Sequence, residues 1–125
     1  SDTTRHFAAL SIVHGGDQIG IQALVDGLDS EEHRVVEGAS YVLTELLSIG
    51  AIDEATAFEK VRTLCRNIDP RVRRNAVRAL VHFERKGAAR EVLDSALQDS
   101  DPEVRAAAER TRGVLRTAIA VELFG

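Results

Sequence analysis

The sequence predicts an all-α protein built from repeated helix–turn–helix units. Apolar residues recur three and four positions apart over most of the chain, as they do on the buried face of a helix. The segment Asp-Pro-Arg-Val-Arg at 69–73 returns 32 residues later as Asp-Pro-Glu-Val-Arg at 101–105. No segment combines apolar residues at every second position with hairpin turn residues, so we expect no sheet.

The residues that begin and end helices divide the chain into seven predicted helices. They span approximately residues 4–14, 17–28, 31–48, 54–67, 70–85, 88–98 and 102–122. In the first half, Gly16 ends one helix and Asp17 begins the next as its N-cap. Asp29 with Glu32 predicts a capping box for the third helix, and Gly50 ends it.

The second half repeats these signals. Asp53 is the predicted N-cap of the fourth helix, Asp69 caps the fifth, and Pro70 stands at its first position, where no amide proton is needed. Gly87 is the predicted left-handed stop after the fifth helix. The predicted buried face of the fourth helix consists of Ala55, Phe58, Val61, Leu64, Cys65 and Ile68.

Length and composition restrict the class of protein. The 125 residues suit a single repeat domain, residues 1–125, and the chain could also be an excerpt of a longer array. Its 44% hydrophobic and 29% charged residues exclude a disordered tail, and one cysteine excludes an internal disulfide. No apolar run approaches the ~18 residues of a membrane span, and we recognise no secretory leader, so we expect a cytoplasmic protein.

One extended motif resembles a known repeat family. Asp69-Pro70-x-Val72-Arg73-x-x-Ala76-x-x-Ala79-Leu80 is similar to the first helix of HEAT-like repeats, in particular the short PBS-lyase type. A looser copy with Val35, Ala39, Val42 and Leu43 lies 37 residues earlier. The resemblance covers nearly the whole chain and implies an armadillo-like α-α superhelix, a HEAT-like solenoid of about three and a half repeats. Arg112 stands where this pattern has a leucine, which indicates a long terminal capping helix.

The resemblance also implies structural roles for several residues. In HEAT-like stacks the arginine of the motif ties neighbouring repeats together, so Arg73 and Arg105 are expected to form a ladder with Asp69 and Asp101. Gly38, in the middle of a predicted helix, is expected to allow close helix packing.

Candidate metal and catalytic residues are sparse. His33 and Glu37 are the best-spaced metal-ligating pair, but two ligands are fewer than a metal site needs, so we expect no metal and no other cofactor. Cys65 falls on an apolar helix face, where a thiol is usually inert, although Arg62 and Arg66 could lower its pKa if it were exposed. No nucleophile elbow or phosphate-binding glycine loop is present, so we expect no catalytic residue.

Arginines concentrate in one part of the sequence. The cluster consists of Arg62, Arg66, Arg71, Arg73, Arg74 and Arg78, and Arg85 extends the helical stripe of Arg71, Arg74 and Arg78. In HEAT-like stacks the second helix of each repeat lines the concave face, so Arg62 and Arg66 are expected there. Residues 1–60 carry eleven acidic and three basic residues, net −8, while residues 61–125 carry nine and thirteen, net +4. This acidic half and a pI near 5.5 argue against binding a long nucleic acid.

The first and last predicted helices are unusually apolar for the ends of a repeat array. Phe7 lies in the first, Ile119 lies in the last, and Leu123 follows directly after it. Exposed apolar surface on small end helices, a longer array, or docking to a partner or a second copy would each explain them.

These observations together predict a non-enzymatic protein-interaction or scaffold module that binds a partner on its concave face, and the arginine cluster favours an acidic protein surface over nucleic acid as that partner. The candidate partner-binding residues are Arg62, Arg66, Glu59, Asp26 and Gln22. Two alternatives stay open: binding of nucleic acid or another anion, and a role as accessory subunit of a bilin lyase-type enzyme, which the repeat type alone suggests. The alternative anion-binding residues are Arg71, Arg74 and Arg78. We also predict a weak homodimer through a terminal helix.

Overall fold

The protein is all-α, as the sequence predicts. The computed structural model describes residues 2–83 and 87–124, without the side chains of residues 118–120, 122 and 124. Helices account for 80% of the chain, no strand occurs in the described ranges, and the fold is an α-α superhelix. The chain divides into two compact units, Ser1–Lys60 and Val61–Gly125, which are described in turn.

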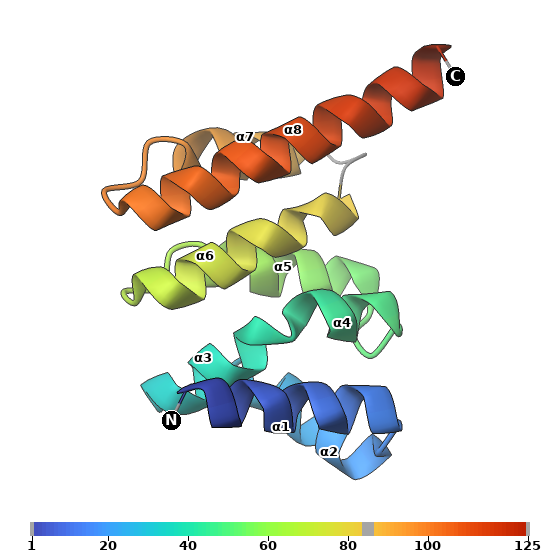
Figure 1. Cartoon of the computed structure of the whole chain (residues 1–125), viewed down its shortest axis with the longest axis vertical. Coiled ribbons are helices and arrows are strands. Elements are labelled where there is room, and N and C mark those ends of the chain that lie inside the picture. The colour runs from blue at the N-terminus through green and yellow to red at the C-terminus, as the bar shows by residue number, and fades with distance from the viewer. Residues whose placement is uncertain (1, 84–86, 125) are drawn as a thin grey trace. The chain divides into compact units, whose positions relative to one another are not determined.

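The first unit contains four helices and the beginning of a fifth. They are α1 (Asp2–Gly15), α2 (Gln18–Gly27), α3 (His33–Tyr41), α4 (Leu43–Ser48) and α5 (Glu54–Leu64) (Figure 1). α1 packs against both α2 and α3, and α2 packs against α3. The core of this unit includes Val13, Ile21, Ala39, Leu43 and Leu46.

Two of the predicted turns in this unit, between α1 and α2 and between α4 and α5, are confirmed. Gly16 and Gly50 have φ values of 71° and 70°, a conformation that glycine adopts without a steric penalty. Asp17 caps α2, and its carboxylate accepts the amide of Ile19 at 3.2 Å. Asp53 in the same way accepts the amide of Thr56 at 3.3 Å.

The predicted capping box of Asp29 and Glu32 is wrong. Glu32 is itself the N-cap of α3 and makes no capping side-chain hydrogen bond. The hydroxyl of Ser30 accepts the amide of Glu32 at 3.1 Å, and Asp29 instead accepts a hydrogen bond from Lys60 at 2.6 Å. The turn therefore ends three residues later than the capping-box pattern requires.

The second unit contains the end of α5, α6 (Pro70–Ala79), the short 3-10 helix η1 (Leu80–Phe83), α7 (Gly87–Ala96) and α8 (Pro102–Phe124). α6 packs along α8, and α7 also packs against α8 (Figure 1). The small and branched residues of the repeated motif form this core: Val72, Ala76, Val104 and Ala108 are completely buried.

The described residues form eight α-helices and one 3-10 helix rather than seven helices, because two predicted helices are interrupted. The predicted helix over 31–48 breaks at Val42, whose amide bonds to the carbonyl of Ala39, three residues back, instead of continuing the α-helical ladder. The predicted helix over 70–85 changes to 3-10 geometry at Leu80. Leu43 and Leu80 are equivalent in the repeat, 37 residues apart, and both are fully buried at these interruptions.

Several finer predictions are also corrected. Gly87 begins α7 instead of ending the preceding helix, and residues 84–86, which include Arg85, lie outside the described residues. Ile68 is 81% exposed because it lies in the turn beyond α5, and Ala55, in the first turn of α5, is exposed too. A Cβ added at Gly38 would meet open space, so this glycine does not serve close helix packing.

The end helices expose apolar side chains. Phe7 in α1 is 67% exposed, and Val121 and Leu123 in α8 are 65% and 69% exposed. The side chain of Ile119 lies outside the described residues. Within the described part of the chain, no helix has both the length and the apolar character needed to cross a bilayer.

Candidate functional site

The repeated motif forms the same hydrogen-bonded turn twice in the second unit. Asn67 and Asp99, two residues before each Asp-Pro pair, use Oδ1 to accept the amides of Asp69 and Asp101 at 2.8 and 2.9 Å. The N-cap aspartates then accept first-turn amides: Asp69 accepts that of Arg71 at 2.9 Å, and Asp101 accepts that of Glu103 at 2.8 Å. These turns fix where α5 and α7 end relative to α6 and α8.

The motif arginines strengthen these turns. Nη1 of Arg73 donates to the carbonyl of Asn67 at 2.9 Å, and Nη1 of Arg105 donates to the equivalent carbonyl of Asp99 at 2.6 Å. Each arginine thus reaches back across the turn to the end of the preceding helix, so its role is structural.

The link between successive repeats differs from the predicted ladder. Nε and Nη2 of Arg73 donate to the two carboxylate oxygens of Asp99 at 2.9 and 3.0 Å, so its hydrogen-bonded partner is Asp99 and not Asp69 or Asp101. The hydrogen bonds that Arg73 donates to Asp99 hold the pKa of Arg73 above its usual value. Burial acts to raise the pKa of Asp99, but the hydrogen bonds from Arg73 and from the Asp101 amide, with nearby arginine charge, lower it overall. The pair is therefore ionised under ordinary conditions.

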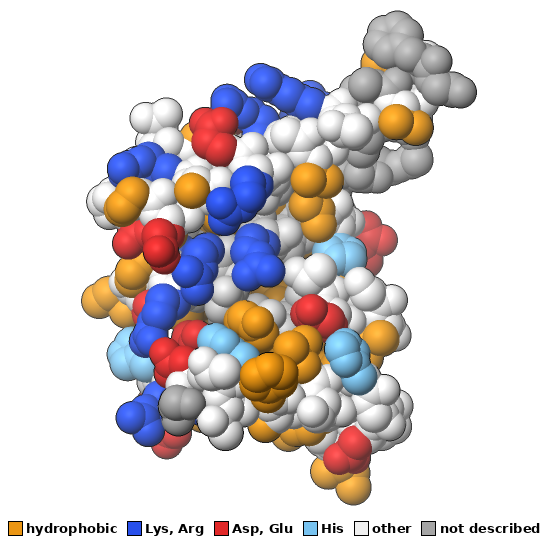
Figure 2. All heavy atoms as spheres, viewed as in Figure 1, with side chains coloured by type: hydrophobic (Ala, Val, Ile, Leu, Met, Phe, Trp, Pro, Cys, Tyr) orange, Lys and Arg blue, Asp and Glu red, His pale blue; other side chains and the backbone are white. Residues whose placement is uncertain are grey.

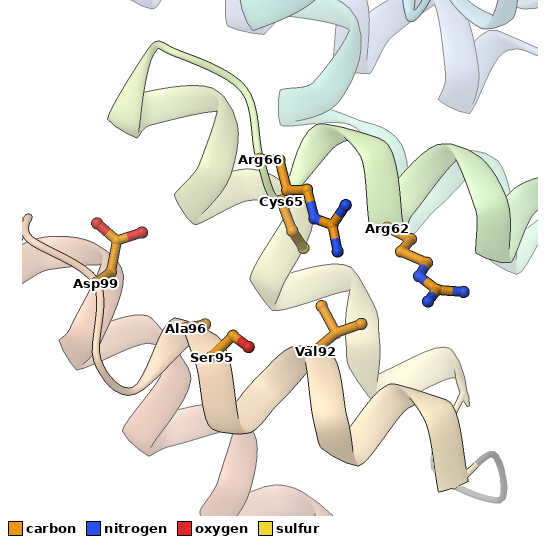
Figure 3. A pocket seen from close by; sticks show the side chains of 7 residues that line it. All are labelled: Arg62, Cys65, Arg66, Val92, Ser95, Ala96 and Asp99. Atoms are coloured by element: carbon orange, nitrogen blue, oxygen red, sulfur yellow. The ribbon is translucent and has the colours of Figure 1, made fainter.

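A pocket of about 190 Å³ lies beside this link, between the end of α5 and α7 (Figure 3). Arg62, Cys65 and Arg66 come from α5 and the turn after it, and Val92, Ser95, Ala96 and Asp99 come from α7 and the turn after it. In Figure 3 the guanidinium groups of Arg62 and Arg66 extend from α5 toward α7, where Val92 and Ser95 face them. The structure thus brings together two of the five predicted partner-binding residues.

The end of α5 explains why both arginines face the same pocket. The amide of Cys65 bonds to the carbonyl of Val61 at 2.9 Å, and that of Arg66 bonds to the carbonyl of Thr63 at 3.0 Å. The helical winding therefore continues one turn past Leu64 and places Arg66 one turn beyond Arg62. Basic side chains at a helix C-terminus also interact favourably with its dipole, which gives both residues a structural benefit besides any binding role.

Cys65 does not have the properties of a reactive thiol. Burial raises its pKa to about 12, and this effect outweighs the lowering by the charge of Arg66. Although the residue borders the pocket and is half-buried, almost none of it is thiolate at neutral pH. The alternative interpretation, in which the neighbouring arginines activate Cys65, is therefore wrong.

The alternative anion-binding arginines are largely engaged by acidic side chains. Arg71 donates to both carboxylate oxygens of Asp69, at 3.3 and 3.1 Å, and Arg74 donates to Glu103 at 2.9 Å. Arg78 is exposed. Figure 2 shows Lys and Arg side chains gathered over α6 and α8, interspersed with acidic ones. An anion at the surface of α6 would have to compete with these carboxylates.

The remaining predicted site residues belong to the first unit. Gln22 donates to Asp26 at 2.9 Å on the exposed side of α2, and Glu59 is exposed on α5. Gln22 also borders a hollow of about 290 Å³ between the turns at Gly16 and Gly50. Gln22, Asp26 and Glu59 therefore lie in the first unit and do not line the pocket of the second unit.

Glu37, which the sequence pairs with His33 only by spacing, contacts α1 instead of His33. Its side chain is 2% exposed and accepts Nε2 of His6, with 2.8 and 3.0 Å between that nitrogen and the two carboxylate oxygens. Nη2 of Arg5 lies 3.6 Å away, and the ring of His6 stacks on Tyr41 with 3.7 Å between centroids. His33 is exposed, and the described residues contain no cluster of three or more possible metal ligands.

Sequence reasoning missed this cluster, in which the half-buried Arg5, His6 and Tyr41 surround the buried Glu37. A signal was present, since Glu37 stands on the apolar face of its helix, beside the buried Val36 and Ser40. A carboxylate at such a position requires a hydrogen-bonding or charged partner. The spacing within one helix could not reveal that the partner lies on α1.

Comparison with known proteins agrees with this architecture. A family model of HEAT repeats matches residues 43–111, which include the repeated turns and the pocket. Comparison with curated proteins gives no significant match. The match covers more than half of the 125 residues, and the chain therefore belongs to the HEAT-repeat family.

Proposed function

We propose that this protein is a non-enzymatic interaction module that binds an acidic partner protein at the face formed by the end of α5 and by α7. HEAT repeats commonly mediate protein–protein interactions, and the family is generally non-enzymatic. The observation that carries the proposal is the pocket in which Arg62 and Arg66 extend over the apolar side chains of α7. Guanidinium groups beside apolar surface are typical of protein-binding hot spots.

Charge reversal at the pocket tests this function. The variant Arg62→Glu/Arg66→Glu should lose the bound partner in an affinity capture, because both attractive charges become repulsive. Arg110→Glu is the matched control, since Arg110 is an exposed arginine of α8 in the same unit and does not line the pocket. Unchanged capture by the double variant, with unchanged helix content, would overturn the proposal.

A weak homodimer through a terminal helix is a second proposal, supported by the exposed Val121 and Leu123 of α8. Buried apolar surface contributes about 25 cal/mol per Å², whereas exposed ion pairs contribute less than about 1 kcal/mol each, so we expect association that persists at high salt. Leu123→Glu should abolish the rise of sedimentation mass with concentration. A protein that stays monomeric at millimolar concentration would refute the dimer.

Within the family, we infer that these are short repeats of the PBS-lyase type. The 32-residue spacing between Asp69 and Asp101 supports this subtype. Repeat type by itself does not determine activity, so it gives little support to a role as a lyase accessory subunit.

A further inference from the structure

We propose that the groove between α7 and α8 binds an acidic amphipathic helix of a partner protein. A pocket of about 290 Å³ opens in this groove. Its lining consists of Arg90, Leu93 and Asp94 of α7 and of Arg112, Leu115 and Arg116 of α8. None of these residues lines the pocket between α5 and α7, so the inference concerns a second surface and goes beyond the proposed function.

The repeat shows that a helix packs at the equivalent place one repeat earlier. The 32-residue repeat relates Leu80 and Phe83 of η1 to Arg112 and Leu115 of α8. At η1 the chain leaves the line of α6, and α7 then packs against η1. At the corresponding place α8 continues as one helix instead of turning back (Figure 1). Along the described residues, therefore, no helix covers α8 there in the way that α7 covers η1.

The floor of the groove is apolar and suits one face of a helix. Leu93 and Leu115 line the pocket and are each only 4% exposed, whereas Arg90 and Arg116 at its rim are exposed. A helix is about 10 Å wide with its side chains, so only one of its faces enters a pocket of this size. Helices bind such grooves through apolar side chains three and four positions apart.

The rim selects an acidic helix. The lining contains three arginines and one acidic residue, Asp94. Arg112 donates to Glu109 of its own helix, so part of its charge is compensated. Arg90 and Arg116 have no hydrogen-bonded or ion-pair partner among the described residues. Carboxylates beside the apolar face of a bound helix complement these two charges, and a basic helix would be repelled.

A second copy of this chain is the competing occupant, through the end of α8 that exposes Val121 and Leu123. The segment 117–124 contains one acidic residue. It matches the apolar floor of the groove but offers little to the two arginines of the rim. A partner helix with several acidic residues complements both the floor and the rim.

The test uses three blocked peptides of about 18 residues, or five helical turns. The first has leucines three and four positions apart and glutamates at the flanking positions. The second has lysines in place of the glutamates, and the third has the residues of the first in an order that gives no apolar face. Binding to the whole ¹⁵N-labelled protein is followed by NMR titration of the amide signals of Leu93 and Leu115.

We expect saturable shifts with the glutamate peptide, at least tenfold weaker binding of the lysine peptide, and no saturable shift with the reordered peptide. Equal binding of the glutamate and lysine peptides would refute selection by charge. Equal binding of the glutamate and reordered peptides would refute recognition of an apolar helix face.

Substitutions locate the binding site. Arg90→Glu and Arg116→Glu should each weaken binding of the glutamate peptide at least fivefold, because an attractive charge becomes repulsive. Arg110→Glu is the matched control and should change binding less than twofold, since Arg110 is exposed on α8 and does not line the groove. Saturable shifts of Cys65 without shifts of Leu93 would place the peptide in the pocket between α5 and α7 and refute the inference.

Sedimentation of the same variants distinguishes a second copy from a partner helix. If Arg90→Glu/Arg116→Glu abolishes self-association of the protein, a second copy occupies the groove and the partner-helix inference fails. If no peptide binds while partner capture still depends on Arg62 and Arg66, this inference fails and the proposed function stands.

Discussion

The contact between Arg73 and Asp99 should couple the two repeats of the second unit in a measurable way. The side chain of Arg73 is only 15% exposed and that of Asp99 only 13%, and two N–H···O hydrogen bonds of 2.9 and 3.0 Å join them. Hydrogen bonds to charged groups contribute about 1.5–3 kcal/mol each. Arg73→Ala also removes the donation to the carbonyl of Asn67, so we expect it to lower the free energy of unfolding by about 3–4 kcal/mol.

A double-mutant cycle separates the pair from the other bonds of the two residues. Urea unfolding of Arg73→Ala, Asp99→Ala and the double variant should give a coupling energy of about 1.5–3 kcal/mol. Arg105→Ala is the control, because Arg105 makes the equivalent bond within its own turn, to the backbone carbonyl of Asp99. A coupling energy below about 0.5 kcal/mol, the value of an exposed ion pair, would refute the structural role assigned to this contact.

The pH dependence of this coupling has a definite sign. The pKa of Asp99 is lower in the folded protein than the usual 3.8, so its contribution to stability is fully present above the unfolded value and is lost as pH falls through the lower folded value. The pKa of Arg73 is raised above its usual value by its hydrogen bonds to Asp99, so its contribution disappears only in strongly alkaline solution. The coupling energy should therefore be constant from pH 5 to 9 and decrease below about pH 4. A decrease near pH 6 would contradict the assignment to these two groups.

Three further predictions concern the core and the turns. Gly38→Ala should raise stability by about 0.5–1 kcal/mol in thermal unfolding, because a Cβ there meets open space, whereas Gly50→Ala should lower it by about 1 kcal/mol or more, because φ is 70°. Cys65, with a pKa of about 12 against a usual 9.0, should react with thiol reagents at pH 8 at least a hundredfold more slowly in the folded than in the unfolded protein, and equal rates would refute its burial. His6→Ala should cost about 2–3 kcal/mol because the buried carboxylate of Glu37 loses its contact with the His6 ring nitrogen, and adding Glu37→Gln should restore part of the loss; no restoration would show that the charge of Glu37 is not the cause.

The elements that local chemistry determines could be predicted from the sequence. Asp17, Asp53 and Asp69 act as N-caps and Gly16 and Gly50 end helices as expected, because each of these effects involves residues within three or four positions. The break at Val42 could not be predicted in this way. The residues around it are acceptable in a helix, and the interruption accompanies the complete burial of the apolar residues on both sides of the turn.

The candidate site was predictable in part for the same reason. Arg62 and Arg66 are four residues apart, so their common orientation follows from helical geometry, and both line the pocket. The opposite wall, with Val92 and Ser95, lies about 30 residues further along the chain and depends on how the repeats stack. The predicted partners of Arg73 were Asp69 and Asp101, and the observed partner, Asp99, lies two residues before Asp101. Asp99 belongs to the turn between α7 and α8, and its carboxylate points toward Arg73.

The repeat itself distinguishes residues that build this fold from residues that the fold does not require. Arg73 has its counterpart in Arg105, and Asp69 in Asp101, and both copies make the same turn bonds. Residues with a structural role are expected in every repeat, because every repeat has to form the same turn between its helices. Arg62 and Arg66, by contrast, are replaced after 32 residues by Asp94 and Gln98. Stacking therefore does not require a basic residue at either position, and the two arginines mark one face of one repeat as different in charge from its neighbour.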